Sequence, residues 1–276
     1  MEFYSNTMNL NFAGDVGYLT FKEFEKYKFI KHAFSTKLGG VSKNEFSTMN
    51  LSFTRGDNEE DVVKNYEIFS SALNFDINKI FRTSQVHGTN IKMITENDIS
   101  ENSCLKTNVF EKTDGLITNL QGIVLQTFHA DCPAIFMFDK VKKVVGVAHA
   151  GWRGTVAKVS ENLLSAFLKN YNSDKNDIIC GLGPGIGKCC YEVSVDILPY
   201  FENLNLENYF SYSKKNGEKA FVDLLEVNRQ VLINAGLNKN NIFKSDVCTM
   251  CNKDLLFSHR ATCGKRGNNS AFIKLL

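Results

Sequence analysis

The sequence predicts a mixed α+β fold in a single domain, and three observations support this. Strand candidates between residues 115 and 149 follow one another without an intervening helix, which favours antiparallel pairing over a repeated strand–helix–strand unit. Helix candidates are few and lie far apart along the chain. No linker, low-complexity tract or internal repeat divides the 276 residues, and the three prolines mark no domain boundary. We therefore expect one domain over residues 1–276.

Three segments have the pattern of amphipathic helices. Residues 57–73 begin with acidic residues and carry apolar side chains at positions 62, 63, 66, 69 and 73. Residues 156–171 follow a glycine, and residues 221–235 end at Gly236, which suits a helix C-terminus. Seven segments are rich in apolar and β-branched residues and are expected to be strands. They are 29–34, 115–118, 122–129, 132–138, 144–149, 178–182 and 270–275.

Composition excludes several classes of function. The net charge is only +2 and no basic stripe is present, so nucleic-acid binding has no electrostatic support. Residues 1–19 lack the basic start and unbroken apolar run of a secretory signal. The most apolar stretch, 122–138, is interrupted by Gln126, His129 and Asp131, so a transmembrane helix and a membrane partner are not expected. The eight cysteines are then thiols or metal ligands rather than disulfides, and the expected compartment is the cytosol.

Two consecutive strands carry a cysteine and a histidine with metal-ligand chemistry. A hairpin turn at Lys140–Val141 would place Cys132 directly opposite His149, with Cβ atoms roughly 4.5–5.5 Å apart. His87, before a glycine in "SQVHGTN", is a third candidate. Two histidines and a cysteine with an open fourth position are typical of a catalytic zinc site. Each residue alone is more often a packing or hydrogen-bonding residue.

Other cysteines and glycines give weaker signals. Cys248, Cys251, His259 and Cys263 form the pattern C-x2-C-x7-H-x3-C, which a structural zinc site would permit, although unpaired thiols are the simpler interpretation. The adjacent Cys189 and Cys190 are expected to be packing residues, with Cys190 near the site. The glycine-rich stretch "CGLGPGIGKCC" matches neither the dinucleotide nor the P-loop fingerprint, which favours a tight loop.

Three basic residues are candidates for anion contacts. Lys37 lies beside Gly39 and Gly40, where it would hold a phosphate or simply extend into solvent. Arg153 and Arg260 follow the histidine-containing segments and would grip oxyanions through two parallel hydrogen bonds. On sequence alone, each arginine is more often a surface residue.

The motifs "QVHG", "ADCPAIFMFD" and "HAGWRGT" together resemble the signature blocks of a bacterial family. Its members were long labelled polyphenol oxidases or multicopper laccases and are now regarded as zinc-dependent purine nucleoside phosphorylases with adenosine deaminase activity. Further similar blocks are "STKLGGVS", "NLSFTRGDNEEDVVKNY", "DGLIT", "GPGIGKCCYEV" and "FSHRATCGKRG". The resemblance extends from about residue 30 to the C-terminus.

The resemblance implies a four-layer α/β/β/α architecture with mixed, largely antiparallel sheets. It places the zinc ligands on His87, Cys132 and His149, the residues already selected by their chemistry. It implies a purine nucleoside (adenosine, inosine, guanosine or methylthioadenosine) and phosphate as substrates. Trp152 would then stack on the purine or wedge its loop into the core. Lys37 replaces the arginine usual in its block and so loses a planar grip on phosphate, and the block around Arg260 also departs from the family pattern.

Three alternatives remain open at this stage. A cysteine hydrolase, for example an amidase editing peptidoglycan precursors, would use Cys132 and His149 as nucleophile and base. A copper phenol oxidase is disfavoured because five scattered histidines do not supply a type-1 site plus a trinuclear cluster. A non-catalytic zinc-binding module is disfavoured by the open fourth position. The oligomeric state is not indicated by the sequence.

Overall fold

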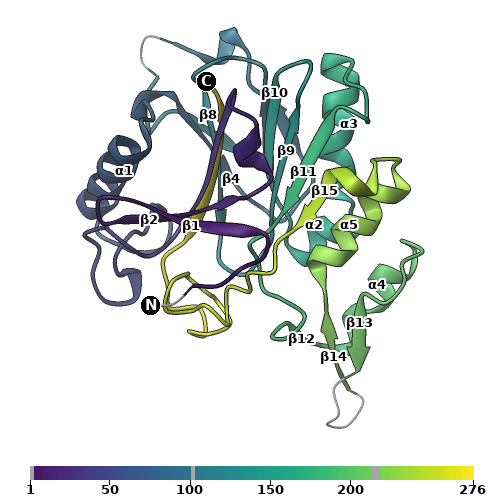
Figure 1. Ribbon diagram of the computed structural model, residues 1–276. Helices are drawn as coiled ribbons and strands as arrows, with labels where there is room; N and C mark the ends of the chain where they lie inside the picture. Colours follow the sequence, from purple (N-terminus) through teal and green to yellow (C-terminus); the bar gives the residue numbers. More distant parts are fainter. Residues whose placement is uncertain (1–2, 101–102, 213–217) are drawn as a thin grey trace.

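Two β-sheets packed face to face form the centre of the protein (Figure 1). The computed structural model describes residues 3–100, 103–212 and 218–276. The larger sheet has seven strands in the order β1-β2-β3-β16-β8-β4-β6. They are β1 (Met8–Ala13), β2 (Val16–Phe21), β3 (Ile30–Ser35), β16 (Asn269–Leu275), β8 (Val124–His129), β4 (Ile80–Ser84) and β6 (Val109–Glu111).

The second sheet has six strands in the order β15-β11-β9-β10-β7-β5. They are β15 (Ile242–Lys244), β11 (Ile178–Leu182), β9 (Ala134–Asp139), β10 (Val144–His149), β7 (Gly115–Thr118) and β5 (Ile91–Met93). Most neighbours in both sheets are antiparallel, and parallel pairs lie toward the edges, at β8-β4-β6, β15-β11 and β7-β5. The predicted α+β class with mixed, largely antiparallel sheets is confirmed.

Helices cover the outer faces of both sheets and complete four layers. Helix α1 (Glu59–Leu73) packs on the seven-stranded sheet, with Tyr66 and Phe69 against Phe272 and its neighbours. Helices α3 (Val159–Tyr171) and α5 (Leu224–Asn234) pack on the six-stranded sheet. The predicted α/β/β/α arrangement is therefore confirmed (Figure 1). Within the described ranges, no helix is both long and apolar enough to cross a bilayer.

A small third sheet extends away from the main body beside helix α5 (Figure 1). Its strands are β12 (Glu192–Ser194), β14 (Lys219–Val222) and β13 (Phe210–Tyr212). Helix α4 (Pro199–Glu202) and the start of α5 pack against it through an apolar cluster of their own. None of these strands was predicted, because each is short and lacks a regular apolar alternation.

The predicted helices form, with two corrections. The first begins at Glu59 because the Asn58 side chain accepts hydrogen bonds from the backbone N–H groups of Glu60 and Asp61. The predicted helix 156–171 begins at Val159 instead, because a separate short helix, α2 (Trp152–Val156), precedes it and ends before Lys158, whose φ of 63° is left-handed. The third begins at Leu224 rather than 221 because strand β14 occupies the residues before the capping Asp223.

The predicted register of the β9–β10 hairpin is wrong by two residues. Asp139 pairs with Val144, so residues 140–143 form the turn, and His149 lies opposite Ala134 rather than Cys132. Asp139 fixes this longer turn, because its carboxylate accepts the backbone N–H groups of Val141 and Lys142, both at 2.8 Å. A two-residue shift keeps every side chain on its predicted face.

The packing between the sheets gives a stability prediction for Phe138. This ring is fully buried on β9 and lies 4.9 Å from the Phe24 ring and 4.8 Å from the Tyr27 ring, centroid to centroid. Phe138→Ala should lower the free energy of unfolding by about 3–5 kcal/mol, because it removes these contacts and leaves a cavity. Val141→Ala, in the exposed hairpin turn, should change it by less than about 0.5 kcal/mol. Denaturant unfolding measures both, and equal losses would contradict the assignment of this core.

Candidate metal centre

Three side chains that can bind a metal meet where strands of the two sheets end. His149 is the last residue of β10, Cys132 lies in the β8–β9 connection, and His87 lies in the β4–β5 connection. One ligand atom from each residue lies within 4.8 Å of the others. The structure brings together the three predicted ligands, although by a different route from the predicted cross-strand pair. The chain turns at Asp131, which has a φ of 87°, and carries Cys132 back toward His149.

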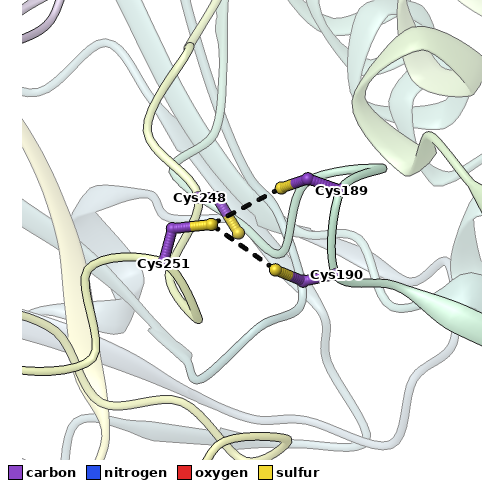
Figure 2. Close-up of side chains that lie close together, drawn as sticks. All are labelled: Cys189, Cys190, Cys248 and Cys251. Carbon is purple, nitrogen blue, oxygen red and sulfur yellow. Dashed lines mark hydrogen bonds between the residues drawn. The ribbon is translucent and has the colours of Figure 1, made fainter.

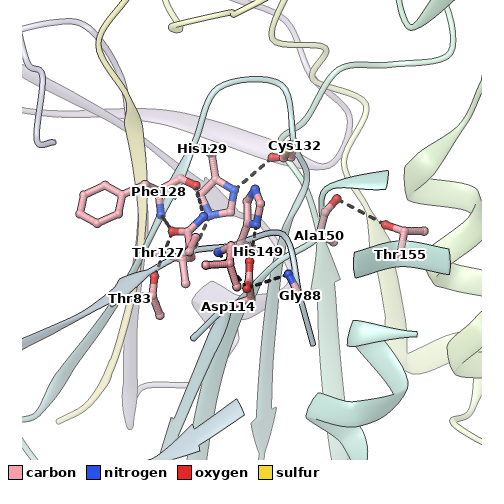
Figure 3. Close-up of polar contacts among 12 residues, drawn as sticks. Thr83, Gly88, Asp114, Thr127, Phe128, His129, Cys132, His149, Ala150 and Thr155 are labelled. Carbon is pink, nitrogen blue, oxygen red and sulfur yellow. Dashed lines mark hydrogen bonds and ion pairs between the residues drawn. The ribbon is translucent and has the colours of Figure 1, made fainter. Parts of the chain in front are cut away.

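The carboxylate of Asp114 orients the two histidines (Figure 3). It is fully buried just before β7, and its Oδ1 lies 3.0 Å from Nδ1 of His149. Its Oδ2 accepts the backbone N–H groups of Gly88 at 2.8 Å and Val86 at 3.2 Å, which flank His87. A carboxylate only accepts, so Nδ1 of His149 donates to Asp114, and Nε2 is the nitrogen that can bind a metal once it loses its proton. His87 is held in a left-handed conformation, with a φ of 60°, that a histidine seldom adopts.

A third histidine, His129, fixes the backbone at Cys132 (Figure 3). Its Nδ1 lies 3.0 Å from the carbonyl oxygen of Cys132, and its Nε2 lies 2.8 Å from Oγ1 of Thr127. The carbonyl can only accept, so Nδ1 donates and Nε2 receives the threonine hydroxyl. Burial holds the pKa of His129 well below its usual value, and the ring stays neutral. His129 therefore positions the cysteine and keeps no nitrogen free for a metal.

Cys132 and His149 form a thiolate–imidazolium pair in the metal-free protein. Burial alone would raise the pKa of Cys132, but the charge of His149 and hydrogen bonds from both histidines lower it to about 6. Burial alone would lower the pKa of His149, but the Cys132 thiolate and the hydrogen bond to Asp114 raise it to about 9. The cysteine is thus held as the thiolate, the form that binds metals and attacks electrophiles.

Gly151 leaves space for an ion beside the three side chains. A Cβ at this position would lie 2.6 Å from Cδ2 of His87, 3.3 Å from Sγ of Cys132 and 3.4 Å from Cε1 of His149. Only glycine permits this approach. The convergence of imidazole nitrogens and a thiolate, with one histidine fixed by a carboxylate behind it, is the pattern of a metal centre with a supporting shell.

The three side chains lie at one side of a cavity of about 630 Å³, a volume typical of small-molecule sites. Strands β4, β6 and β8 form its floor, and the loop after residue 51 and the segment before β16 form its walls. The residues that line it include the three metal-binding candidates together with Arg55, Arg82, Gln85, Lys106, Glu111, Phe128 and Arg266.

Two half-buried arginines in the cavity wall, Arg55 and Arg266, form no ion pair within the described part of the chain. The Nε atoms of Arg55 and Arg266 are buried and have no hydrogen-bond partner. Burial and, next, the positive charge of Arg55 lower the pKa of Arg266 to about 10. Two neighbouring guanidinium groups with unused donors are arranged to receive an anion, since planar guanidinium groups match phosphate and carboxylate oxygens.

The remaining predicted site residues do not line this cavity. The Lys37 ammonium donates to the carbonyl of Lys253 at 2.6 Å and lies over the Phe257 ring. Trp152 packs against the apolar cluster of the small sheet, with its ring 5.7 Å from that of Tyr200. Trp152 was predicted either to stack on the purine or to wedge its loop into the core, and this packing favours the second role.

Arg153 and Arg260 lie on the other side of the Cys132 loop. The Arg153 guanidinium stacks on Trp152, 4.4 Å from the ring. Arg260 donates from Nη1 to the carbonyl of Glu192 at 2.8 Å. Its backbone N–H donates to Oδ2 of Asp131 at 2.7 Å, while Thr249 donates to Oδ1 at 2.6 Å. Both oxygens of Asp131 are therefore occupied, which makes it an anchor for the loop rather than a free general base.

The sequence reasoning missed Asp114, Arg55 and Arg266. All three lie inside blocks that carry the family resemblance, "DGLIT", "NLSFTRGDNEEDVVKNY" and "FSHRATCGKRG". Their position in those blocks was the one feature of the sequence that could have identified them as site residues. The C-x2-C-x7-H-x3-C group, which the sequence permits but does not favour, is not assembled among the described residues, because Cys248 and Cys251 gather with Cys189 and Cys190 instead of His259 and Cys263. The interpretation of Cys189 and Cys190 as packing residues is also wrong, since Cys189 is exposed and Cys190 only partly buried.

The Asp114–His149–Cys132 chain gives a pH prediction. In chelator-treated protein, the rate at which iodoacetamide modifies Cys132 should rise with a midpoint near pH 6. Asp114→Asn removes the charge that favours the His149 cation, so the pKa of His149 falls and the thiolate loses its partner. The Cys132 midpoint should therefore move upward by about one pH unit or more, toward the ordinary thiol value. Peptide mass spectrometry follows Cys132 separately from the other cysteines.

Asp98→Asn is the matched control, because this carboxylate pairs with Lys92 rather than with His149. It should leave the Cys132 midpoint unchanged. An unchanged midpoint in Asp114→Asn would show that Asp114 does not act on the thiol through His149.

Comparisons with known proteins agree with this geometry. The family described as multi-copper polyphenol oxidoreductase laccase matches residues 31–276. The purine nucleoside phosphorylase YlmD of Bacillus subtilis is 32% identical over 87% of this chain and 86% of its own length. Adenosine deaminase RL5, from an unknown prokaryotic organism, is 32% identical over 86% of this chain and 93% of its own.

A solved structure extends the likeness to the whole fold. The crystal structure of Bacillus licheniformis hypothetical protein YfiH superposes with a TM-score of 0.89 at 31% identity, and it covers 98% of this chain and 100% of its own. The resemblance found in the sequence motifs is confirmed. The chain belongs to the family described as multi-copper polyphenol oxidoreductase laccase, which includes relatives named as a purine nucleoside phosphorylase and an adenosine deaminase.

Proposed function

We propose that this protein is a zinc-dependent purine nucleoside phosphorylase that also deaminates adenosine. The observation that carries the proposal is one cavity that holds both the His87–Cys132–His149 group and two half-buried arginines, Arg55 and Arg266, whose buried Nε atoms have no hydrogen-bond partner among the described residues. The names of the relatives supply the substrate class, a purine nucleoside with phosphate. A cavity of about 630 Å³ is large enough for both.

The donor set favours zinc over copper. Two imidazole nitrogens and one thiolate are a donor set typical of catalytic zinc, and His87, Cys132 and His149 would hold the ion beside the cavity. A trinuclear copper cluster requires many more histidines near one another. In the described part of the chain, His129 is engaged by Thr127 and Cys132, and His32 lies in an aromatic cluster 4.9 Å from the Phe24 ring. When bound, zinc would supply Lewis-acid polarisation and lower the pKa of water.

Arg55 and Arg266 are proposed to bind the phosphate. Their Nε–H groups are buried and unpaired, so they can donate to phosphate oxygens, and an anion would relieve the repulsion between the two charges. This assignment replaces Lys37, Arg153 and Arg260, whose side chains are engaged outside the cavity. A phosphate held there can attack C1′ of the ribose, forming ribose 1-phosphate and releasing the purine base.

Deamination uses the same cavity with water in place of phosphate. The oxygen of water becomes bonded to C6 of the purine, and the 6-amino group leaves as ammonia. The chain would hold the purine near the metal group and exclude bulk solvent. Phe128, which lines the cavity beside β4, offers an aromatic face for the base. Asp114 fixes the ring of His149 through Nδ1, and His129 fixes the backbone of Cys132 through its carbonyl, so both ligands are held in place.

A cysteine nucleophile is the second candidate, and one observation favours it. Asp114, His149 and Cys132 form a carboxylate–imidazole–thiol series, and the pKa of Cys132 is lowered to about 6. The two candidates differ in what the thiol does in the protein as purified. A metal-bound thiolate resists iodoacetamide until a chelator is added, whereas a free nucleophile reacts at once. The cytosol is the compartment that we propose, because thiolates persist in a reducing environment.

The proposed function predicts two products from one protein. Wild-type protein incubated with adenosine and phosphate should produce ribose 1-phosphate and inosine, measured by chromatography. His149→Ala should reduce both activities by at least about a hundredfold, since it removes a ligand and the partner of Asp114. His259→Ala, an exposed histidine outside the metal group, should retain both. Absence of both products from zinc-loaded wild type would refute the proposal.

The phosphate assignment predicts that the two activities can be separated. Arg266→Ala should raise the KM for phosphate in phosphorolysis by about tenfold or more, because a charge-assisted hydrogen bond is lost. Adenosine deamination consumes no phosphate and should change by less than about twofold. Arg229→Ala is the matched control, since this arginine pairs with Glu226 on helix α5. Equal losses in both activities would instead indicate a general structural role for Arg266.

A further inference from the structure

The structure assembles a second group of sulfur ligands outside the cavity. Cys189 and Cys190 lie in the loop after β11, and Cys248 and Cys251 lie in the segment after β15. Figure 2 shows their four thiols turned toward one another from two facing loops. All four sulfur atoms lie within 4.8 Å of one another. We propose that these cysteines hold a structural zinc ion that clamps the two loops together.

The sulfur distances match tetrahedral coordination. Sγ of Cys251 lies 3.6 Å from Sγ of Cys189 and 3.4 Å from Sγ of Cys190. A disulfide requires about 2.05 Å, and all four cysteines are free thiols. Four sulfurs at a zinc–sulfur distance of about 2.3 Å stand about 3.8 Å apart. The cluster is therefore close to the size that zinc imposes and too wide for a bridge.

Each pair of cysteines is presented by a tight turn. The Gly187 carbonyl accepts the backbone N–H groups of Cys190 at 2.9 Å and Tyr191 at 3.0 Å, which turns adjacent thiols in one direction. The Cys248 carbonyl accepts the N–H of Asn252 at 3.1 Å and its side-chain amide at 2.8 Å. An isolated bridge between Gly185 and Cys248 then aligns the two turns. Backbone pairing thus positions the ligands independently of a metal.

The surroundings suit thiolate ligands. The backbone N–H of Gly187 donates to Sγ of Cys248 at 3.2 Å, a contact that stabilises negative charge on sulfur. A Cβ at Gly187 would lie 3.2 Å from Sγ of Cys189 and 3.2 Å from Cβ of Cys248, so the glycine keeps room for the cluster. The Arg260 guanidinium reaches the Cys190 carbonyl at 3.4 Å and brings positive charge to the same loop.

The clamp would support the catalytic cavity without taking part in the reaction. Thr249, between the two cysteines of its turn, donates to Asp131, the residue before Cys132. Ile186 in the other loop donates its N–H to the Asp131 carbonyl at 2.7 Å. Both clamped loops therefore contact the connection that carries the catalytic thiol. Tetrahedral sulfur ligation with no open position is typical of structural zinc, which contributes directly to folding stability.

Zinc content of the full-length chain, measured by mass spectrometry of the metal, tests the proposal. Wild type should contain about two zinc ions per chain. The variant Cys132→Ser/His149→Ala, which disables the catalytic group, should retain about one. X-ray absorption of that variant should show four sulfur ligands at about 2.3 Å. Three outcomes would overturn the proposal. The first is iron in place of zinc, seen by its visible absorption, and the second is a disulfide detected by alkylation under non-reducing conditions. The third is a retained ion with nitrogen ligands.

Variants of the cluster provide the controls. Cys251→Ser should lose one zinc and lower the melting temperature by about 5 °C or more, while the catalytic ion stays bound. Cys251→His, which keeps a ligand atom, should restore part of the zinc. Cys189→Ser, at an exposed position, gives the same test should Cys251→Ser not fold. Cys263→Ser and His259→Ala should leave the zinc content unchanged. Loss of zinc in either variant would show that the ligands have been assigned to the wrong residues.

Discussion

The buried carboxylate of Asp114 is the interaction on which the metal centre depends. A desolvated carboxylate must be satisfied by hydrogen bonds, and its donors come from two separate parts of the chain. They are the backbone on either side of His87, at Val86 and Gly88, and the ring of His149. Two connections are involved, β4 to β5 and β6 to β7. Each passes from the seven-stranded sheet to the six-stranded sheet. The same charge that holds these connections also fixes which nitrogen of His149 faces the site.

The third ligand is held by a second carboxylate with a comparable role. The β8–β9 connection is another crossing between the sheets, and Asp131 anchors it to Thr249 and to the backbone of Arg260. His129 then fixes the carbonyl of Cys132 from the other side. Neither carboxylate is free to act as a base. Both instead hold strained connections, with left-handed backbone at His87 and Asp131, in the one arrangement that brings three ligands together.

The parts of the fold that were predicted are those whose information is local. Helix α1 and strands β3, β7, β8, β9, β10, β11 and β16 follow from periodicity, while short strands such as β5 and β12 carry too little pattern. The proximity of Cys132 and His149 was anticipated, but from a hairpin register wrong by two residues. Asp114 and Arg266 gain their roles only when connections that are far apart in the sequence come together in the fold. The spacing of residues along the chain does not reveal such contacts. For the same reason Cys189 and Cys190 could not be matched to Cys248 and Cys251, since their loops meet through tertiary pairing.

Charge links the two halves of the cavity. The negative charges of Asp131 and, next, of the Cys132 thiolate raise the pKa of Arg266, opposing the effects of burial and of Arg55. Zinc on that thiolate would remove the contribution of Cys132 and so strengthen the attraction of the two arginines for an anion. Phosphate should consequently bind more tightly to the zinc-loaded protein than to the metal-free protein. Because coupling between two binding sites is reciprocal, phosphate should then strengthen retention of zinc by the same factor. The two ligands of the cavity are in this way expected to stabilise each other before any nucleoside arrives.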